Sequence, residues 1–68
     1  MIVHFPEPDS AYLVVAALRQ QLRVAAVAGV YVVPTDSGPA LECADSAWGD
    51  ELVQDLVAAF QGSAADEI

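Results

Sequence analysis

The sequence has few of the residues that usually stabilise very small proteins. Its 68 residues include one cysteine, one histidine, two arginines and no lysine. A single cysteine excludes a disulfide within the chain, and Cys43 with His4 cannot supply the four cysteine and histidine ligands of a usual structural zinc site. A domain of this size buries only about 60% of its unfolded surface. We therefore expect its stability to depend on a partner or on self-association.

Long hydrophobic runs are also missing. Apolar stretches without a charged residue include 10–18 and 24–35, and both are shorter than the ~20 residues that a membrane-spanning helix needs. No basic region precedes an apolar core at the N-terminus, as it would in a secretory signal. We therefore expect no membrane association and a reduced, cytoplasmic setting.

Positive charge is scarce and unevenly placed. Residues 1–35 contain two acids and two arginines, whereas residues 36–68 contain eight acids and no base. The net charge of −8 would repel nucleic acid and anionic membranes and attract a basic protein surface. Because 56% of the residues are hydrophobic, we also expect apolar surface that is covered in a homodimer or a hetero-complex.

The hydrophobic pattern predicts five elements. They are a strand at 1–5, a helix from 10 to about 23–26, strands at 30–33 and 39–44, and a helix at 45–61. The helices are inferred from apolar residues that recur at three- and four-residue spacing. In the first helix this spacing predicts a core stripe of Ala11, Val15, Leu18, Leu22 and Ala25. The strands are inferred from β-branched and alternating runs, and the turn composition of 35–38 joins the last two strands in a hairpin.

This βαββα order predicts an α+β fold. We expect a two-layer sandwich in which both helices cover one face of a small three-stranded sheet, mixed or antiparallel. If the third strand lies centrally, every neighbouring pair is antiparallel. Residues 1–62 are expected to form a single domain and residues 63–68 a flexible acidic tail. Three strands leave one face and two edges exposed, which again favours pairing with another chain.

The helix expected at 45–61 has the most distinct local signals. Asp45 and Ser46 are both residue types that cap helix N-termini, and Gly62 lies where a left-handed residue would end the helix. Gly49 does not fit a continuous helix, because a glycine inside a helix costs about 1 kcal/mol relative to alanine. The helix has an apolar stripe on one side and carboxylates on the other.

Catalytic and metal-binding arrangements are weakly represented. Cys43 and His4 could lie on adjacent strands, but no third group is spaced to orient the base, and acidic surroundings would raise the pKa of the thiol. The carboxylates of Asp50, Glu51 and Asp55 do not have the spacing of a calcium-binding loop. We expect no catalytic residue, no metal site and no cofactor.

One segment resembles a known family. Ala44-Asp45-Ser46, followed by Glu51-Leu52-Val53, Leu56 and Phe60, looks like the phosphopantetheine-attachment segment of acyl carrier proteins. The resemblance covers seventeen residues and departs at Ala47, where that family usually has leucine. It implies a four-helix bundle in which Ser46 would carry the prosthetic arm and the acidic helix would dock on basic enzymes.

The sequence favours a small acidic protein-binding module without catalytic activity. Such a module would dock on a basic protein surface, for example that of a nucleic-acid-binding protein or complex, by mimicking the charge of nucleic acid, as inhibitors of the anti-CRISPR type encoded by phages do. The alternatives are a structural or oligomerisation subunit of a larger assembly and an acyl-carrier-like protein modified at Ser46. The residues predicted to bind the partner are Asp36, Glu42, Asp45, Asp50, Glu51 and Asp55.

Overall fold

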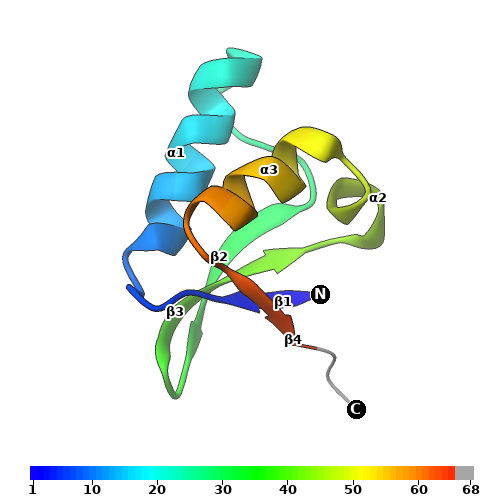
Figure 1. Cartoon of the computed structure of the whole chain (residues 1–68). Coiled ribbons are helices and arrows are strands. Elements are labelled where there is room, and N and C mark those ends of the chain that lie inside the picture. The colour runs from blue at the N-terminus through cyan, green and yellow to red at the C-terminus, as the bar shows by residue number, and fades with distance from the viewer. Residues whose placement is uncertain (66–68) are drawn as a thin grey trace.

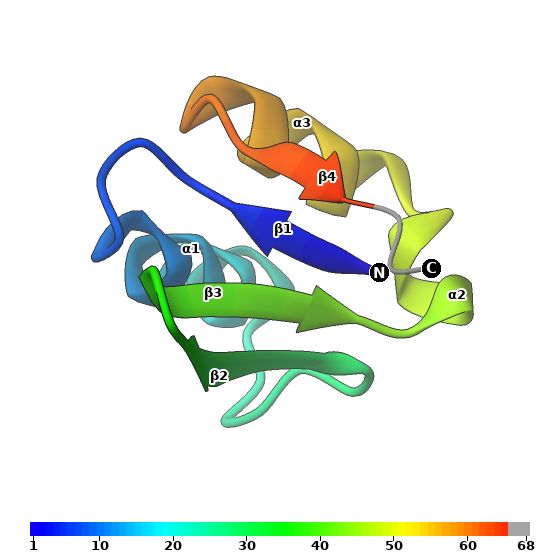
Figure 2. The same cartoon turned by 90° about the horizontal axis from the view of Figure 1, so that it is seen from below.

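A computed structural model of the chain describes residues 1–65. In chain order the elements are β1 (Ile2–His4), α1 (Ser10–Leu22), β2 (Val30–Thr35), β3 (Gly38–Cys43), α2 (Asp45–Trp48), α3 (Glu51–Ala59) and β4 (Ser63–Ala65). The strands form one sheet in the order β2-β3-β1-β4, and each neighbouring pair is antiparallel. Helices α1 and α3 lie on one side of this sheet (Figure 1), and the other side is open (Figure 2). The predicted α+β class is confirmed, with one strand and one helix more than expected.

The third strand lies between the first and the second. Strand β3 pairs with β2 through the hairpin, from Val30 opposite Cys43 to Thr35 opposite Gly38. On its other side it pairs with β1, where Val3 lies opposite Leu41. This central position is the condition under which the sequence predicted an antiparallel sheet throughout.

The segment after α3 forms a strand that the sequence analysis did not predict. Ser63–Ala65 pair with β1, with Ala64 opposite Val3. The expected flexible tail is therefore corrected over 63–65, and its remaining residues, 66–68, lie outside the described part of the chain. Because β4 takes one side of β1, the first strand lies inside the sheet.

Gly62 makes room for this fourth strand. A Cβ atom on Gly62 would lie 2.7 Å from Cε1 of Phe5, 2.8 Å from Cγ1 of Val3 and 2.8 Å from Cγ1 of Val57. Side chains from β1 and α3 therefore occupy the space that any other residue would need. The left-handed residue expected at Gly62 is instead Gln61, with a φ of 61°. Gly62 is required because the three side chains pack closely against its backbone, and Gln61 makes the turn.

The predicted helix at 45–61 is broken into α2 and α3. Asp50 is the N-cap of α3, in extended conformation, and its Oδ1 accepts a hydrogen bond of 2.8 Å from the backbone N–H of Leu52. Gln54 Nε2 donates to the carbonyl oxygen of Trp48 at 2.7 Å. The break is stable because these bonds satisfy backbone groups that a continuous helix would have paired. The N-cap of α2 is Ala44, without a side-chain bond, so the capping expected from Asp45 or Ser46 was wrong.

Helix α1 begins as predicted but ends slightly earlier. Arg23 takes a left-handed conformation, with φ 57° and ψ 46°, and its N–H donates to the carbonyl oxygen of Arg19. The chain then leaves the helix direction, so Leu22 is 46% exposed. The predicted core stripe is correct at Ala11, Val15 and Leu18, which are buried. It is wrong at Leu22 and Ala25, which are exposed.

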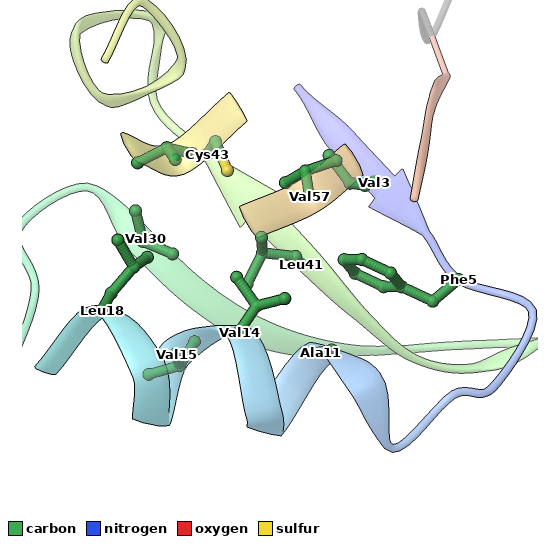
Figure 3. Packing of buried hydrophobic residues seen from close by; sticks show 11 residues of the cluster. Val3, Phe5, Ala11, Val14, Val15, Leu18, Val30, Leu41, Cys43 and Val57 are labelled. Atoms are coloured by element: carbon green, nitrogen blue, oxygen red, sulfur yellow. The ribbon is translucent and has the colours of Figure 1, made fainter. Parts of the chain in front are cut away.

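The core fills the space between the sheet and the two helices (Figure 3). Its largest fully buried side chains come from three elements and are Leu18, Leu41, Val3, Val14 and Cys43. Strand residues alternate between this core and the open face. Leu41 and Cys43 point inward, whereas Glu42 between them is exposed.

Candidate protein-binding surface

Four of the six predicted partner-binding residues lie on α2 and α3. Asp45 is in the first turn of α2, Asp50 caps α3, and Glu51 occupies the first turn of α3. Asp55 follows Glu51 by four residues and therefore lies on the same helix face. All four side chains are exposed. We call these residues, Asp45, Asp50, Glu51 and Asp55, the α2–α3 acidic surface.

The other two predicted residues lie elsewhere. Asp36 is at the tip of the β2–β3 hairpin, and the six residues of β3 separate it from α2, a length of about 20 Å at the usual strand rise. Glu42 is on the open face of the sheet, because it alternates with two inward-pointing neighbours. The sequence showed all six residues to be acidic, but only the fold separates them into three places.

Local structure favours negative charge on the α2–α3 acidic surface. The N-terminus of α3 carries a partial positive charge, which stabilises carboxylates at its cap and in its first turn. Asp50 and Glu51 occupy these two positions. No basic residue occurs between residues 36 and 65, and the two arginines lie in or next to the last turn of α1. The surface can therefore attract a cationic partner.

An apolar pocket of about 400 Å³ adjoins the acidic surface. Val30 and Val53, each less than 5% exposed, are its buried lining residues, and Leu22 and Val24, both more than 40% exposed, are its exposed large hydrophobic ones. Asp50 is its one charged lining residue. The remaining residues that line it are Ala26, Val27, Ala28, Ser46 and Ala47. The sequence did not predict this pocket, because the spacing of apolar residues assigned Leu22 to the core.

Cys43 and His4 do not form a pair. Cys43 points into the core and has no exposed surface. In the register of β1 and β3, Val3 faces the core opposite Leu41, so His4 projects from the opposite side of the sheet. Burial is the main cause that raises the pKa of the Cys43 thiol above its ordinary value of 9.0, with a smaller effect of Glu42 in the same direction and an opposing effect of the N-terminal amine.

The carrier-protein resemblance is not matched by the fold. Ser46 is exposed and lies in α2 beside the pocket. However, α2 precedes a second short helix and a strand of an antiparallel sheet, whereas the resemblance implied a four-helix bundle. The shared letters around Ser46 therefore occur in a different structural setting.

Within residues 1–65, no group of three or more histidine, cysteine or acidic side chains is placed to hold a metal ion. Over the same range, no helix has the length and apolar character needed to cross a membrane.

Comparison of the chain with protein-family models, with curated proteins and with solved structures finds no match. Function is therefore inferred from the residues of the candidate surface and from general physical chemistry. The α2–α3 acidic surface and its adjoining pocket are the features on which that inference rests.

Proposed function

We propose that this protein is a non-catalytic binding module whose α2–α3 acidic surface docks on a basic surface of another protein. The observation that supports this function is the placement of four exposed carboxylates on two adjoining helices, with no base between residues 36 and 65. Basic protein surfaces of this kind commonly bind nucleic acid. The protein would then act as an inhibitor that occupies such a surface in place of nucleic acid, as anti-CRISPR-type inhibitors do.

The electrostatic contribution has a defined dependence on salt. Charge complementarity mainly accelerates encounter and selects the partner, and it is screened over about 8 Å at physiological ionic strength. Binding should therefore be strong at low salt and weaker, though specific, at physiological salt. Asp36 and Glu42 lie apart from the α2–α3 acidic surface, so we expect them to contribute less to the short-range part of binding.

The test compares two double charge reversals. Glu51→Lys with Asp55→Lys removes the centre of the α2–α3 acidic surface, and Glu7→Lys with Asp9→Lys makes the same change in net charge near the start of α1. All four residues are exposed. With a fluorescent arginine-rich peptide as the probe, the first pair should weaken binding at 150 mM salt by about tenfold and the second by much less.

Two results would contradict the proposal. If both double variants weaken binding equally, the peptide responds to net charge and no defined surface exists. If the Glu51 and Asp55 variant binds as well as the original chain, the docking surface lies elsewhere. Duplex DNA that fails to compete for the peptide would remove the nucleic-acid-mimic part of the proposal alone.

The open face of the sheet favours one second candidate function, a subunit that assembles through this face. Tyr31 is 59% exposed in β2, and no helix within residues 1–65 covers that side of the sheet (Figure 2). In such a subunit the acids would only maintain solubility. Tyr31→Ser would then abolish association, as measured by light scattering, while the charge reversals would leave it unchanged.

A further inference from the structure

We propose that the pocket beside the α2–α3 acidic surface receives one large apolar side chain of the basic partner. The occupant is a protein segment in which leucine or phenylalanine is flanked by arginine or lysine. This inference rests on the proposed function and specifies the chemistry of the partner. It makes the pocket the centre of the interface and the carboxylates its charged border.

The lining residues have the exposure expected of a docking pocket. Val30 and Val53 are buried lining residues, whereas Leu22 and Val24 are lining residues exposed to solvent. These last two are among the five large hydrophobic residues that the described chain exposes. Large apolar side chains that remain exposed beside a concavity commonly mark a site of interaction. The volume of about 400 Å³ lies within the usual range of ligand pockets.

The charges around the pocket indicate a basic occupant. Asp50 belongs both to the pocket lining and to the acidic surface. Asp45 and Glu51 are the chain neighbours of the lining residues Ser46 and Asp50. Arg23 is the one base adjacent in sequence to the lining, between Leu22 and Val24, so acids outnumber bases near the opening. A segment that inserts an apolar side chain there would meet carboxylates with its next residues.

This arrangement matches the usual anatomy of protein interfaces. A few residues near the centre carry most of the binding energy, and a charged border excludes water and selects the partner. The pocket that lies between Tyr12 and the end of the hairpin has no charged lining residue. This second pocket therefore gives no reason to expect a basic occupant, in contrast to the pocket beside the α2–α3 acidic surface.

The test uses two peptides of equal charge. One is an arginine-rich helical peptide with a single central phenylalanine, and the other has alanine in its place. The phenylalanine peptide should bind about tenfold more tightly. Trp48 is the only tryptophan of the chain and lies in α2, next to the lining residue Ala47, so its emission should shift with the phenylalanine peptide and not with the alanine peptide.

Two matched variants locate the effect. Leu22→Ala should reduce the affinity for the phenylalanine peptide several-fold, whereas Leu13→Ala, in the same helix and similarly exposed at 52%, should not. Ala26→Phe places a ring in the pocket from an exposed position and should reduce the affinity to that of the alanine peptide. Circular dichroism checks that each variant is folded.

The outcomes separate this inference from the proposed function. If both peptides bind equally and the Glu51 and Asp55 reversal weakens both, the acidic surface binds and the pocket inference is wrong. If neither peptide binds, or the reversal has no effect, the proposed function fails and the pocket inference with it. Equal loss in the Leu22 and Leu13 variants would also overturn the pocket assignment.

Discussion

Helices α1 and α3 cover the same face of the sheet but divide their residues differently. Helix α1 is continuous over 13 residues and buries Ala11, Val14, Val15 and Leu18. Helix α3 has nine residues, buries only Val53 and Val57, and carries two of the four carboxylates of the acidic surface. Five of the 13 residues of α1 are buried, but only two of the nine residues of α3. The difference shows that in so small a domain one helix can supply most of the helical side of the core while the other carries more of the surface charge.

The largest expected effect would come from the buried side of α1. Leu18 is fully buried and contacts the core that β3 and β1 complete. Leu18→Ala should reduce the free energy of unfolding by about 2–5 kcal/mol, because it removes apolar contacts and leaves a cavity. Urea denaturation measures this loss. Leu13→Ala, on the exposed side of the same helix, should change stability by no more than about 0.5 kcal/mol. If both variants lost the same stability, the two sides of α1 would not differ as described.

The next effect concerns the glycine that follows α3. Gly62→Ala should destabilise the fold by about 1–3 kcal/mol, because the new methyl group would lie within 2.8 Å of three core side chains. Gly49→Ala is the control. Gly49 has right-handed helical φ and ψ, and the nearest atom to its Cβ position is 3.9 Å away, so alanine should be neutral or stabilising by about 0.4–1 kcal/mol. Thermal unfolding should show a lower Tm for Gly62→Ala and an unchanged or higher Tm for Gly49→Ala.

A smaller effect tests the break between α2 and α3. Asp50→Ala removes the N-cap bond to Leu52 and should lower stability by about 0.5–2 kcal/mol. Asp45→Ala removes the same charge from a residue without a cap role and should cost no more than about 0.5 kcal/mol. Two equal losses in urea denaturation would mean that charge, and not capping, stabilises this end of the protein.

The smallest effect is a dependence of stability on pH. Burial raises the pKa of Cys43 in the folded state, so the folded protein holds this proton more tightly than the unfolded chain. Stability should therefore fall as pH rises above 9.0, the ordinary value of the thiol. Cys43→Ala should be less stable overall and should show a shallower decline between pH 8 and 10. An identical slope in both proteins would show that other groups cause the decline.

The sequence predicted the fold where the signals were local and repeated. The β-branched run at Val30 and the three- and four-residue spacing in α1 placed two elements to within a few residues. Antiparallel pairing followed from a central third strand. The α+β class required no more than this order of elements.

The remaining features depend on contacts distant in the chain. Ser63–Ala65 has no strong strand propensity and forms β4 because β1 offers an unpaired edge. The role of Gly62 depends on Phe5 and Val3, more than fifty residues away in the sequence. Asp50 was identified as acidic, but capping could have been inferred from the neighbouring Gly49, which disagreed with a continuous helix. The pocket required the early end of α1, which no single residue specified.

The position of β1 inside the sheet has a consequence for the order of folding. Val3 pairs with residues 41 and 64, so β1 is completed only by segments that are distant in the chain. The hairpin and α1 can form early from contacts between nearby residues. Strand β1 can be completed only by pairing with distant residues. Pairings over such distances slow folding. Until Ser63–Ala65 are in place, the side of β1 that β4 covers is an unpaired strand edge, which can pair with another chain.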